Sequence, residues 1–556
     1  MPRSSLFLSV ASAAVLLSAI GGCRTHPDAD LVVVNGTVWT GDQLSDGTAV
    51  AVTGNRIVLV GTDAEMDALI GQQTVRIDAE GGLVAPGFID SHVHLLTGGL
   101  HLASVQLRDA RSKEEFVSRI ADFASRSAPG EWIIGGDWDH TGWGGQLPER
   151  AWIDAVTPDN PVWINRLDGH MALANSAALN IAGVTARSAD VAGGEIVRRA
   201  NGEPTGILKD NAMVLIDRAV PEFTVRQRTD ALKAAMAFLL EQGVTSVHDM
   251  AGEPGSYEAL RVLHDRDDMS VRVYEAFPLS QWRSLQSEID NRGTGDDWLR
   301  IGGLKGFVDG SLGSHTAAFF EPFSDAPNDS GLFVTPPDSL KAWMIASDSL
   351  GLQNFVHAIG DRAIATILGI MEDVAAANGP RDRRFRVEHA QHIRPDDLPR
   401  FAADGVIASM QPYHAIDDGR WAEDVIGPDR IKSTYAFRSL IDGGAQLAFG
   451  SDWFVAPPTP IEGIYAAVTR RTLDGQNPAG WVPEQKLSVE EALRAYTTGA
   501  SFAGFSEKSV GSLQSGYLAD IVILDRDILA EPVDSLGSAR IRMTISNGKV
   551  VYDGAR

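Results

Sequence analysis

Eight short apolar runs recur along the middle of the chain, and this repetition constrains the fold more than any other feature. Most runs are followed by a helical pattern before the next one begins, as at 229–242 and 363–377. Strands that alternate with helices form βα units around a parallel sheet, and eight such strands can close into a barrel. The sequence therefore predicts an α/β chain with a (β/α)8, or TIM, barrel whose strands cover residues 83–90, 243–249, 271–277, 301–308, 352–358, 384–389, 405–410 and 446–451.

The two flanks of this region have a different texture. Residues 31–82 show short strand patterns joined by Asn-Gly or Gly-Asn turns, and residues 500–556 repeat them. We therefore expect one small composite β-sandwich built from both flanks, with the barrel over 83–499. The stretch between 95 and 242 is too long for a single crossover, so an inserted subdomain is expected over about 100–240. Its five tryptophans either fill its core or wall a substrate cleft.

The first 23 residues have the pattern of an export signal. Arg3 precedes an apolar run over 6–20, which has signal-peptide length and is short for a membrane span. Gly21 and Gly22 before Cys23 resemble a bacterial lipobox, in which the cysteine becomes lipidated; the alternative is an ordinary signal peptide with an incidental cysteine. We expect an exported periplasmic or cell-envelope lipoprotein that meets the membrane only through its lipid anchor.

Composition limits the partners and the kind of metal site. The chain has 48 basic and 73 acidic residues, a formal net charge of −25, which disfavours nucleic acid as a partner. Cys23 is the only cysteine, so intramolecular disulfides and thiolate metal cages are excluded. Any metal must therefore be held by nitrogen and oxygen ligands.

Candidate ligands of this kind lie at the ends of the predicted strands. His92 and His94 end the first run, and side chains two apart on a strand share one face, which suits Zn²⁺ or a similar ion. In a chain with 13 histidines this pair alone could be structural. The C-terminal ends of all barrel strands meet at one face, however, and four more candidates lie at or near such ends: Lys305, His357, His389 and Asp452.

The motifs around these residues resemble the amidohydrolase superfamily of metal-dependent hydrolases, in particular its family-3 branch, which includes N-substituted formamide deformylases. The resemblance covers about residues 31–550. It is carried by PGFIDSHVH (86–94), RLDGHMALANS (166–176), GVTSVHDM (243–250), KGFVDGSLGSHTAAF (305–319), VHAIGDRA (356–363), VEHAQHI (387–393), SMQPYH (409–414) and GSDWFVAPPTP (450–460).

The resemblance implies roles for the six candidates. His92 and His94 would bind the more buried metal, with Asp452 as a further ligand and general base. His357 and His389 would bind a second metal or, in single-metal relatives, the substrate. Lys305 matches a lysine that is carboxylated and bridges two metals in many members. Its alternatives are a free lysine that acts as an electrostatic clamp or pairs with Asp309.

Other residues are expected to support this site. Substrate contacts are expected from His170 and His414, which lie in the resembling motifs, from Trp453 beside Asp452, and from Asp309. Metal-bound imidazoles also need acceptors that hold their tautomer. Asp90, Asp361 and Glu388 are candidates, although strand alternation directs Glu388 away from His389's side of its strand.

These observations predict an exported metal-dependent amidohydrolase. It would hydrolyse a C–N bond in a small-molecule amide, N-acyl or N-formyl compound, with Asp452 as general base and one or two divalent metal ions, zinc being favoured. The same chemistry on a cyclic amide, a dipeptide or a deaminated amino-heterocycle stays open. The alternative of another class is a non-catalytic surface binding lipoprotein. Family analogy suggests a homodimer.

Overall fold

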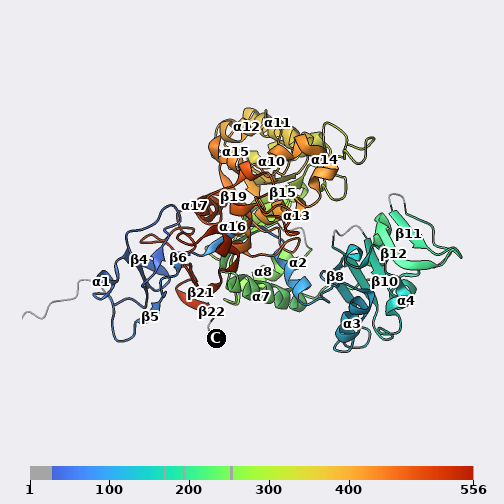
Figure 1. The fold of residues 1–556 in the computed structure, drawn as a ribbon, viewed down its shortest axis with the longest axis horizontal. Helices are drawn as coiled ribbons and strands as arrows, with labels where there is room; N and C mark the ends of the chain where they lie inside the picture. The colour runs from blue at the N-terminus through green and yellow to red at the C-terminus, as the bar shows by residue number, and fades with distance from the viewer. Residues whose placement is uncertain (1–27, 168–170, 192–193, 251–253, 555–556) are drawn as a thin grey trace, which may run out of the picture.

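The computed structural model describes residues 28–167, 171–191, 194–250 and 254–554. Figure 1 shows a composite β-domain at one end, a barrel in the middle and an inserted subdomain at the other end. The predicted export segment and Cys23 lie outside the described residues. Across the described ranges, the helices are all too short or too polar to cross a bilayer.

The central sheet has eight parallel strands, which confirms the predicted barrel. The strands follow one another around the sheet in chain order. Backbone hydrogen bonds from Asp452 N to His92 O (2.7 Å) and from His94 N to Trp453 O (2.6 Å) close the gap between the first and last strands. The strands are β7 (Phe88–Val93), β13 (Val244–Asp249), β14 (Arg272–Pro278), β15 (Leu299–Phe307), β16 (Gln353–Ala358), β17 (Arg386–His389), β18 (Ile407–Met410) and β19 (Leu447–Phe449).

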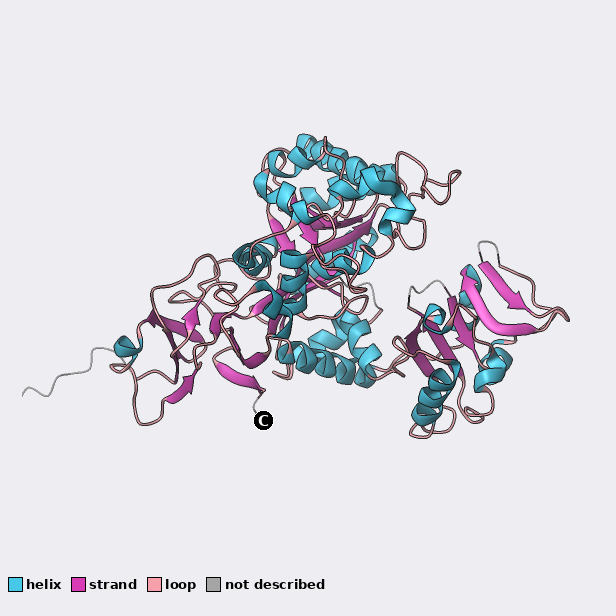
Figure 2. Ribbon diagram, viewed as in Figure 1, coloured by secondary structure: helices cyan, strands magenta, loops and turns pink. Residues whose placement is uncertain are grey.

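Helices pack around this sheet and bury their apolar faces against it. In α11, for example, Ile364, Ile367 and Leu368 share one face at helical spacing and are fully buried. Figure 2 shows this layer of helices around the barrel strands. Its main members are α2 (Leu95–Leu102), α7 (Val225–Glu241), α8 (Ser256–His264), α9 (Trp282–Arg292), α10 (Pro337–Ser349), α11 (Asp361–Asn378), α12 (Leu398–Ala403), α15 (Phe437–Asp442), α16 (Pro460–Thr469) and α17 (Val489–Ala495).

The first apolar run differs from its prediction. The strand expected over 83–90 is two strands, β6 (Leu83–Pro86) and β7, separated by Gly87. β6 pairs with β2 (Thr37–Val38) and β20 (Ile521–Leu524) outside the barrel. Periodicity could not reveal this break because both strands are fully buried and therefore apolar on both faces.

The two flanks of the chain share one β-domain. One sheet has the order β4-β3-β1-β5, and the other, β2-β6-β20-β21-β22, contains strands from both chain ends. Val33 and Val52 from the first sheet and Ile521 and Ile545 from the second lie in one buried cluster. The strands not yet given are β1 (Leu31–Val34), β3 (Ala49–Thr53), β4 (Arg56–Gly61), β5 (Val75–Asp78), β21 (Ile541–Ser546) and β22 (Lys549–Asp553).

The segment between α2 and α7 forms a separate α/β unit with its own five-stranded sheet of order β11-β12-β10-β9-β8. Its tryptophans fill its core: Trp138 is fully buried, and the other four pack in or against the two core clusters of this unit. The unit contains α3 (Lys113–Ala124), β8 (Ile133–Trp138), β9 (Val162–Arg166), β10 (Met171–Ala174), α5 (Ser176–Ala182), β11 (Gly194–Arg198) and β12 (Pro204–Asp210).

Candidate active site

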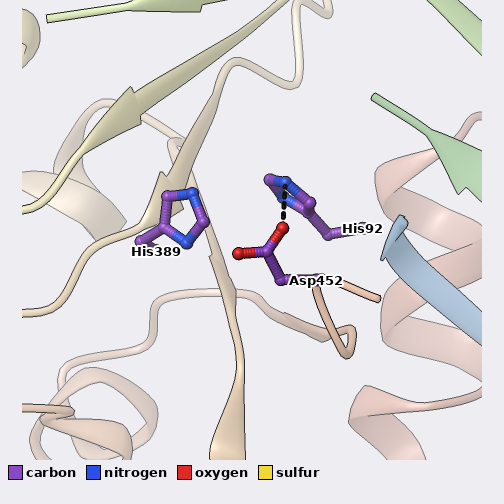
Figure 3. Close-up of side chains that lie close together, drawn as sticks. All are labelled: His92, His389 and Asp452. Atoms are coloured by element: carbon purple, nitrogen blue, oxygen red, sulfur yellow. Dashed lines mark ion pairs between the residues drawn. The ribbon is translucent and has the colours of Figure 1, made fainter. Parts of the chain in front are cut away.

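Three buried side chains from distant parts of the sequence meet at the C-terminal face of the barrel. His92 ends β7, His389 ends β17 and Asp452 follows β19; their ligand atoms all lie within 4.8 Å of one another. Figure 3 shows the Asp452 carboxylate between the two imidazoles. Two nitrogens and a carboxylate oxygen around one point form a donor set that suits Zn²⁺ and similar divalent cations.

Left-handed backbone turns orient two of these residues. His389, the last residue of β17, has φ 72°, and Asp452, in the segment that follows β19, has φ 61°. The alternation of side chains stops at these points, and the ligands turn toward the barrel axis.

His94 extends the cluster toward solvent. Its Nε2 is 3.3 Å from Asp452 Oδ1, and the same oxygen is 3.5 Å from His92 Nε2. The structure therefore brings His94 to the same carboxylate, as expected, although its side chain is partly exposed.

Lys305 and His357 border the cluster on its other side. Lys305 Nζ is 3.1 Å from His92 Nε2, and the His357 and His389 ring centroids are 4.5 Å apart. His357 Nε2 donates to the Gly310 carbonyl at 3.0 Å, which leaves Nδ1 as its available nitrogen. All six predicted candidates therefore converge.

Burial keeps the site in the protonation state that binds cations. It lowers the pKa of His92 to about 4 and that of His357 to about 3, so both imidazoles are neutral at pH 7. Burial alone would raise the pKa of Asp452, but the surrounding histidines hold this pKa well below its usual value. Burial also lowers the pKa of Lys305 to about 8. The site thus offers neutral nitrogens and an ionised carboxylate.

Glu388 holds the tautomer of His92, contrary to the expectation from strand alternation. Its Oε2 lies 2.6 Å from His92 Nδ1, and both side chains are fully buried. Because the left-handed turn at His389 ends the alternation, Glu388 and His389 both face the barrel interior. Gln411 does the same for His389, whose Nδ1 is 2.9 Å from Gln411 Oε1.

The other two acceptor candidates bind backbone instead. Asp90 accepts from the amides of His92 (3.1 Å) and Ser451 (2.9 Å) and so ties β7 to the segment after β19. Burial raises the pKa of Asp90 to about 7. Asp361 accepts from the Phe320 amide at 2.9 Å. Both carboxylates organise the loops that carry the site.

Two expected substrate contacts have other surroundings. The fully buried Asp309 accepts backbone amides of Ala318, Ile359 and Gly360 at 2.8–3.0 Å, so its carboxylate holds two loops together. Trp453 packs in the barrel core, 5.6 Å from Phe238 between ring centroids. Trp453 is thus held in the core away from the ligand cluster, whereas Asp309 Oδ1 also lies 3.6 Å from His357 Nε2 and so borders the cluster.

His414 lies where a substrate contact was expected. Its ring is parallel to that of His389 at a centroid distance of 6.5 Å, and its buried Nε2 has no hydrogen-bond partner among the described residues. His170, the other motif histidine, lies outside the described residues.

Sequence reasoning missed two aromatic walls of the site. Phe307, two residues after Lys305, is 41% exposed, and its ring centroid is 5.3 Å from that of His357. The Phe454 ring lies 6.2 Å from His94 and 4.5 Å from His101 of α2, the helix that leads into the inserted subdomain. The only available signal was their position two residues after a candidate ligand.

Comparisons with known proteins identify the family of this chain. The amidohydrolase family model matches residues 76–552. Protein LONG AFTER FAR-RED 3 of Arabidopsis thaliana is 43% identical over 537 residues, which are 94% of this chain and 92% of that protein. N-substituted formamide deformylase of Arthrobacter pascens is 27% identical over 547 residues, 94% of this chain and 98% of that protein.

A solved structure shares both the fold and much of the sequence. An uncharacterised metal-dependent hydrolase from Pyrococcus horikoshii OT3 superposes with a TM-score of 0.77 at 29% identity, covering 91% of this chain and 99% of that one. The family match spans the barrel and the part of the composite β-domain from β5 onward, and the ligand cluster lies at the catalytic face of that barrel. The chain therefore belongs to the amidohydrolase family and is a metal-dependent hydrolase.

Proposed function

We propose that the protein hydrolyses a C–N bond in a small-molecule amide, N-acyl or N-formyl compound. The observation that carries this proposal is the convergence of His92, His389 and Asp452, buried and within 4.8 Å of one another. The relationship to N-substituted formamide deformylase supports an amide-type substrate.

The residues divide the chemistry between them. A divalent cation held by the histidines and Asp452 would acidify a water molecule and polarise the scissile carbonyl. Asp452 would accept the proton of the attacking water and return it to the leaving amine; its lowered pKa keeps the carboxylate ionised and so able to accept a proton. His414 lies beside His389, its buried Nε2 has no hydrogen-bond partner in the described part of the chain, and it can donate to the substrate oxygen.

The cation in this proposal is zinc, which imidazole and carboxylate donors suit, with Mn²⁺, Co²⁺ and Fe²⁺ as the alternatives that the same donors accept. The number of bound ions depends on the chemical state of Lys305. A carboxylated lysine would bridge two ions, and a free amine beside His92 would accompany a single ion. Elemental mass spectrometry of protein purified without chelators measures this directly. About two equivalents support the bridged arrangement, and one equivalent supports the single-ion site.

The test of catalysis is the variant Asp452→Asn in zinc-loaded protein. We expect kcat/KM on N-substituted formamides and N-acyl amines to fall by about 10³-fold or more, because the proton acceptor is lost while the side-chain volume is kept. Asp534→Asn, an exposed carboxylate on the surface, is the matched control and should leave kcat/KM unchanged.

Two results would contradict the proposal. One is a wild-type protein that binds no Zn²⁺ or Mn²⁺, which would favour the non-catalytic binding protein. The other is an Asp452→Asn variant that is folded by thermal denaturation and retains full activity.

We also propose export as a lipoprotein, on the strength of the apolar run over 6–20 and the Gly-Gly-Cys sequence that ends at Cys23. Expression in a bacterial host with radiolabelled palmitate should label the wild-type chain. The Cys23→Ser variant should stay unlabelled, and equal labelling of both would exclude Cys23 as the acceptor.

A further inference from the structure

We propose that Arg386 is a positioning residue, which acts through Glu388 to fix the orientation and tautomer of His92. The inference rests on the proposed function, because it concerns how the chain holds a cation ligand. The geometry that carries it is a continuous polar chain along the barrel interior: His248, Arg386, Glu388 and His92.

The contact at the ligand end determines which nitrogen of His92 is available. Glu388 Oε2 is 2.6 Å from His92 Nδ1. An ionised carboxylate only accepts hydrogen bonds, so the proton of the neutral ring sits on Nδ1. The lone pair is then on Nε2, the nitrogen that faces Asp452 at 3.5 Å. If the Glu388 carboxylate rotated away, neither the orientation of the His92 ring nor its tautomer would be fixed.

Arg386 opposes this rotation because its guanidinium contacts both carboxylate oxygens of Glu388. Its Nη2 donates to Oε2 at 3.2 Å, and its Nε lies 2.7 Å from Oε1 as an ion pair that lacks hydrogen-bond geometry. Both side chains are fully buried, and the guanidinium lies 4.2 Å from the centroid of the Phe355 ring. A planar guanidinium held on two oxygens restricts the carboxylate to one orientation, which a point charge such as Lys cannot do.

The guanidinium of Arg386 also makes hydrogen bonds to residues of three other strands. Nη2 donates to Ser91 O at 2.6 Å, directly before His92, and to Ser409 Oγ on β18 at 2.9 Å. Nη1 donates to His248 Nδ1 on β13 at 2.8 Å. Arg386 therefore fixes both the backbone at His92 and the side chain that holds its ring.

Stability alone explains this arrangement poorly. A buried ion pair loses much of its attraction to desolvation, and apolar residues of similar volume often serve a core equally well. Partners that orient metal ligands, in contrast, change metal affinity by about 10- to 100-fold when they are replaced.

The experiment measures Zn²⁺ affinity by chelator competition on the full protein, independently of turnover. Arg386→Lys keeps the charge and loses the fork, and Glu388→Gln keeps the shape and loses the charge. We expect both variants to bind Zn²⁺ about 10- to 100-fold more weakly than wild type. The visible absorption spectrum of Co²⁺-loaded protein should shift as well, because the orientation of a ligand changes.

Arg470→Lys is the matched control. Arg470 is also fully buried and holds backbone carbonyls of Trp481 and Tyr435. The Arg470→Lys substitution should lower the melting temperature of the protein and leave its Zn²⁺ affinity unchanged. If Arg386→Lys fails to fold, Glu388→Gln alone decides.

The outcomes separate this inference from the proposed function. Wild-type protein that binds no Zn²⁺ overturns the proposed function, and this inference with it. Wild-type protein that binds Zn²⁺ while both variants bind it equally well overturns the inference alone. A loss of affinity in Arg470→Lys equal to that in Arg386→Lys also overturns it, because any buried arginine would then have the same effect.

Discussion

Phe307 exposes an aromatic ring beside two polar groups of the site. Its side chain is 41% exposed, and Lys305 Nζ lies 5.1 Å from its ring centroid. An apolar surface at the ligand cluster favours substrates with an apolar substituent, which would cover it. Phe307→Ala should lower kcat/KM for such substrates by about 10- to 100-fold and affect formamide itself much less. Phe505→Ala, an exposed phenylalanine far along the sequence, serves as the control; equal losses on all substrates would contradict this role.

His392 predicts how stability changes with pH. It is buried against Phe319, its Nε2 has no hydrogen-bond partner among the described residues, and burial lowers its pKa to about 3. Below a pH of about 6.5 the unfolded chain binds a proton at His392, whereas the native protein does not. The contribution of His392 to the free energy of unfolding is therefore fully present above a pH of about 6.5 and is lost as the pH falls toward 3.

At pH 5 the titration of His392 lowers the free energy of unfolding by about 2 kcal/mol relative to neutral pH. His392→Gln removes the titration. Its unfolding free energy, measured by urea denaturation, should therefore fall less between pH 7.5 and pH 5 than that of wild type. Parallel pH profiles for the two proteins would show that His392 is protonated in the folded state.

At this scale the sequence identified candidate ligands more easily than their surroundings. His92, His94, Lys305, His357, His389 and Asp452 could be singled out because they lie at or near the ends of predicted strands, a local property. Glu388 was a candidate acceptor, but strand alternation counted against it, because the left-handed turn at His389 is not visible in the sequence. Trp453 was assigned to the site from its position beside Asp452, and the packing of its ring against Phe238 was not visible in the sequence.

Among the elements, β14 and the segment before β20 are joined by a buried ion pair. Arg272 contacts both oxygens of Asp520, at 2.7 and 3.1 Å, and both side chains are almost fully buried. Asp520→Ala leaves the arginine charge buried without its partner and should destabilise the protein by about 3–5 kcal/mol. The midpoint of chemical denaturation measures this.

A surface pair in the same region is the natural control. Asp525 pairs with Arg526 in a partly exposed position. Asp525→Ala should cost about 1 kcal/mol or less. If Asp520→Ala were equally mild, the barrel and the composite β-domain would not be held together by this pair.

For the whole molecule, the barrel was the most predictable part and the inserted subdomain the least. Each βα unit has a local signature, and the rule that active sites lie at one barrel face then joins distant residues. In the order β11-β12-β10-β9-β8, the pairing of β10 with β12 skips the intervening β11, and the sequence has no comparable local signal for it. The division of 83–90 into two sheets was hidden for the same reason, since Pro86 pairs with Ile521.

That long-range pairing has a consequence during biosynthesis. β6 is separated only by Gly87 from the strand that carries His92, and its partner β20 is made more than 400 residues later. The ribosome must therefore synthesise nearly the entire chain before β6, which leads into the first barrel strand, can pair with β20. Until then the nascent chain exposes apolar strand edges, which makes it a natural client for chaperones.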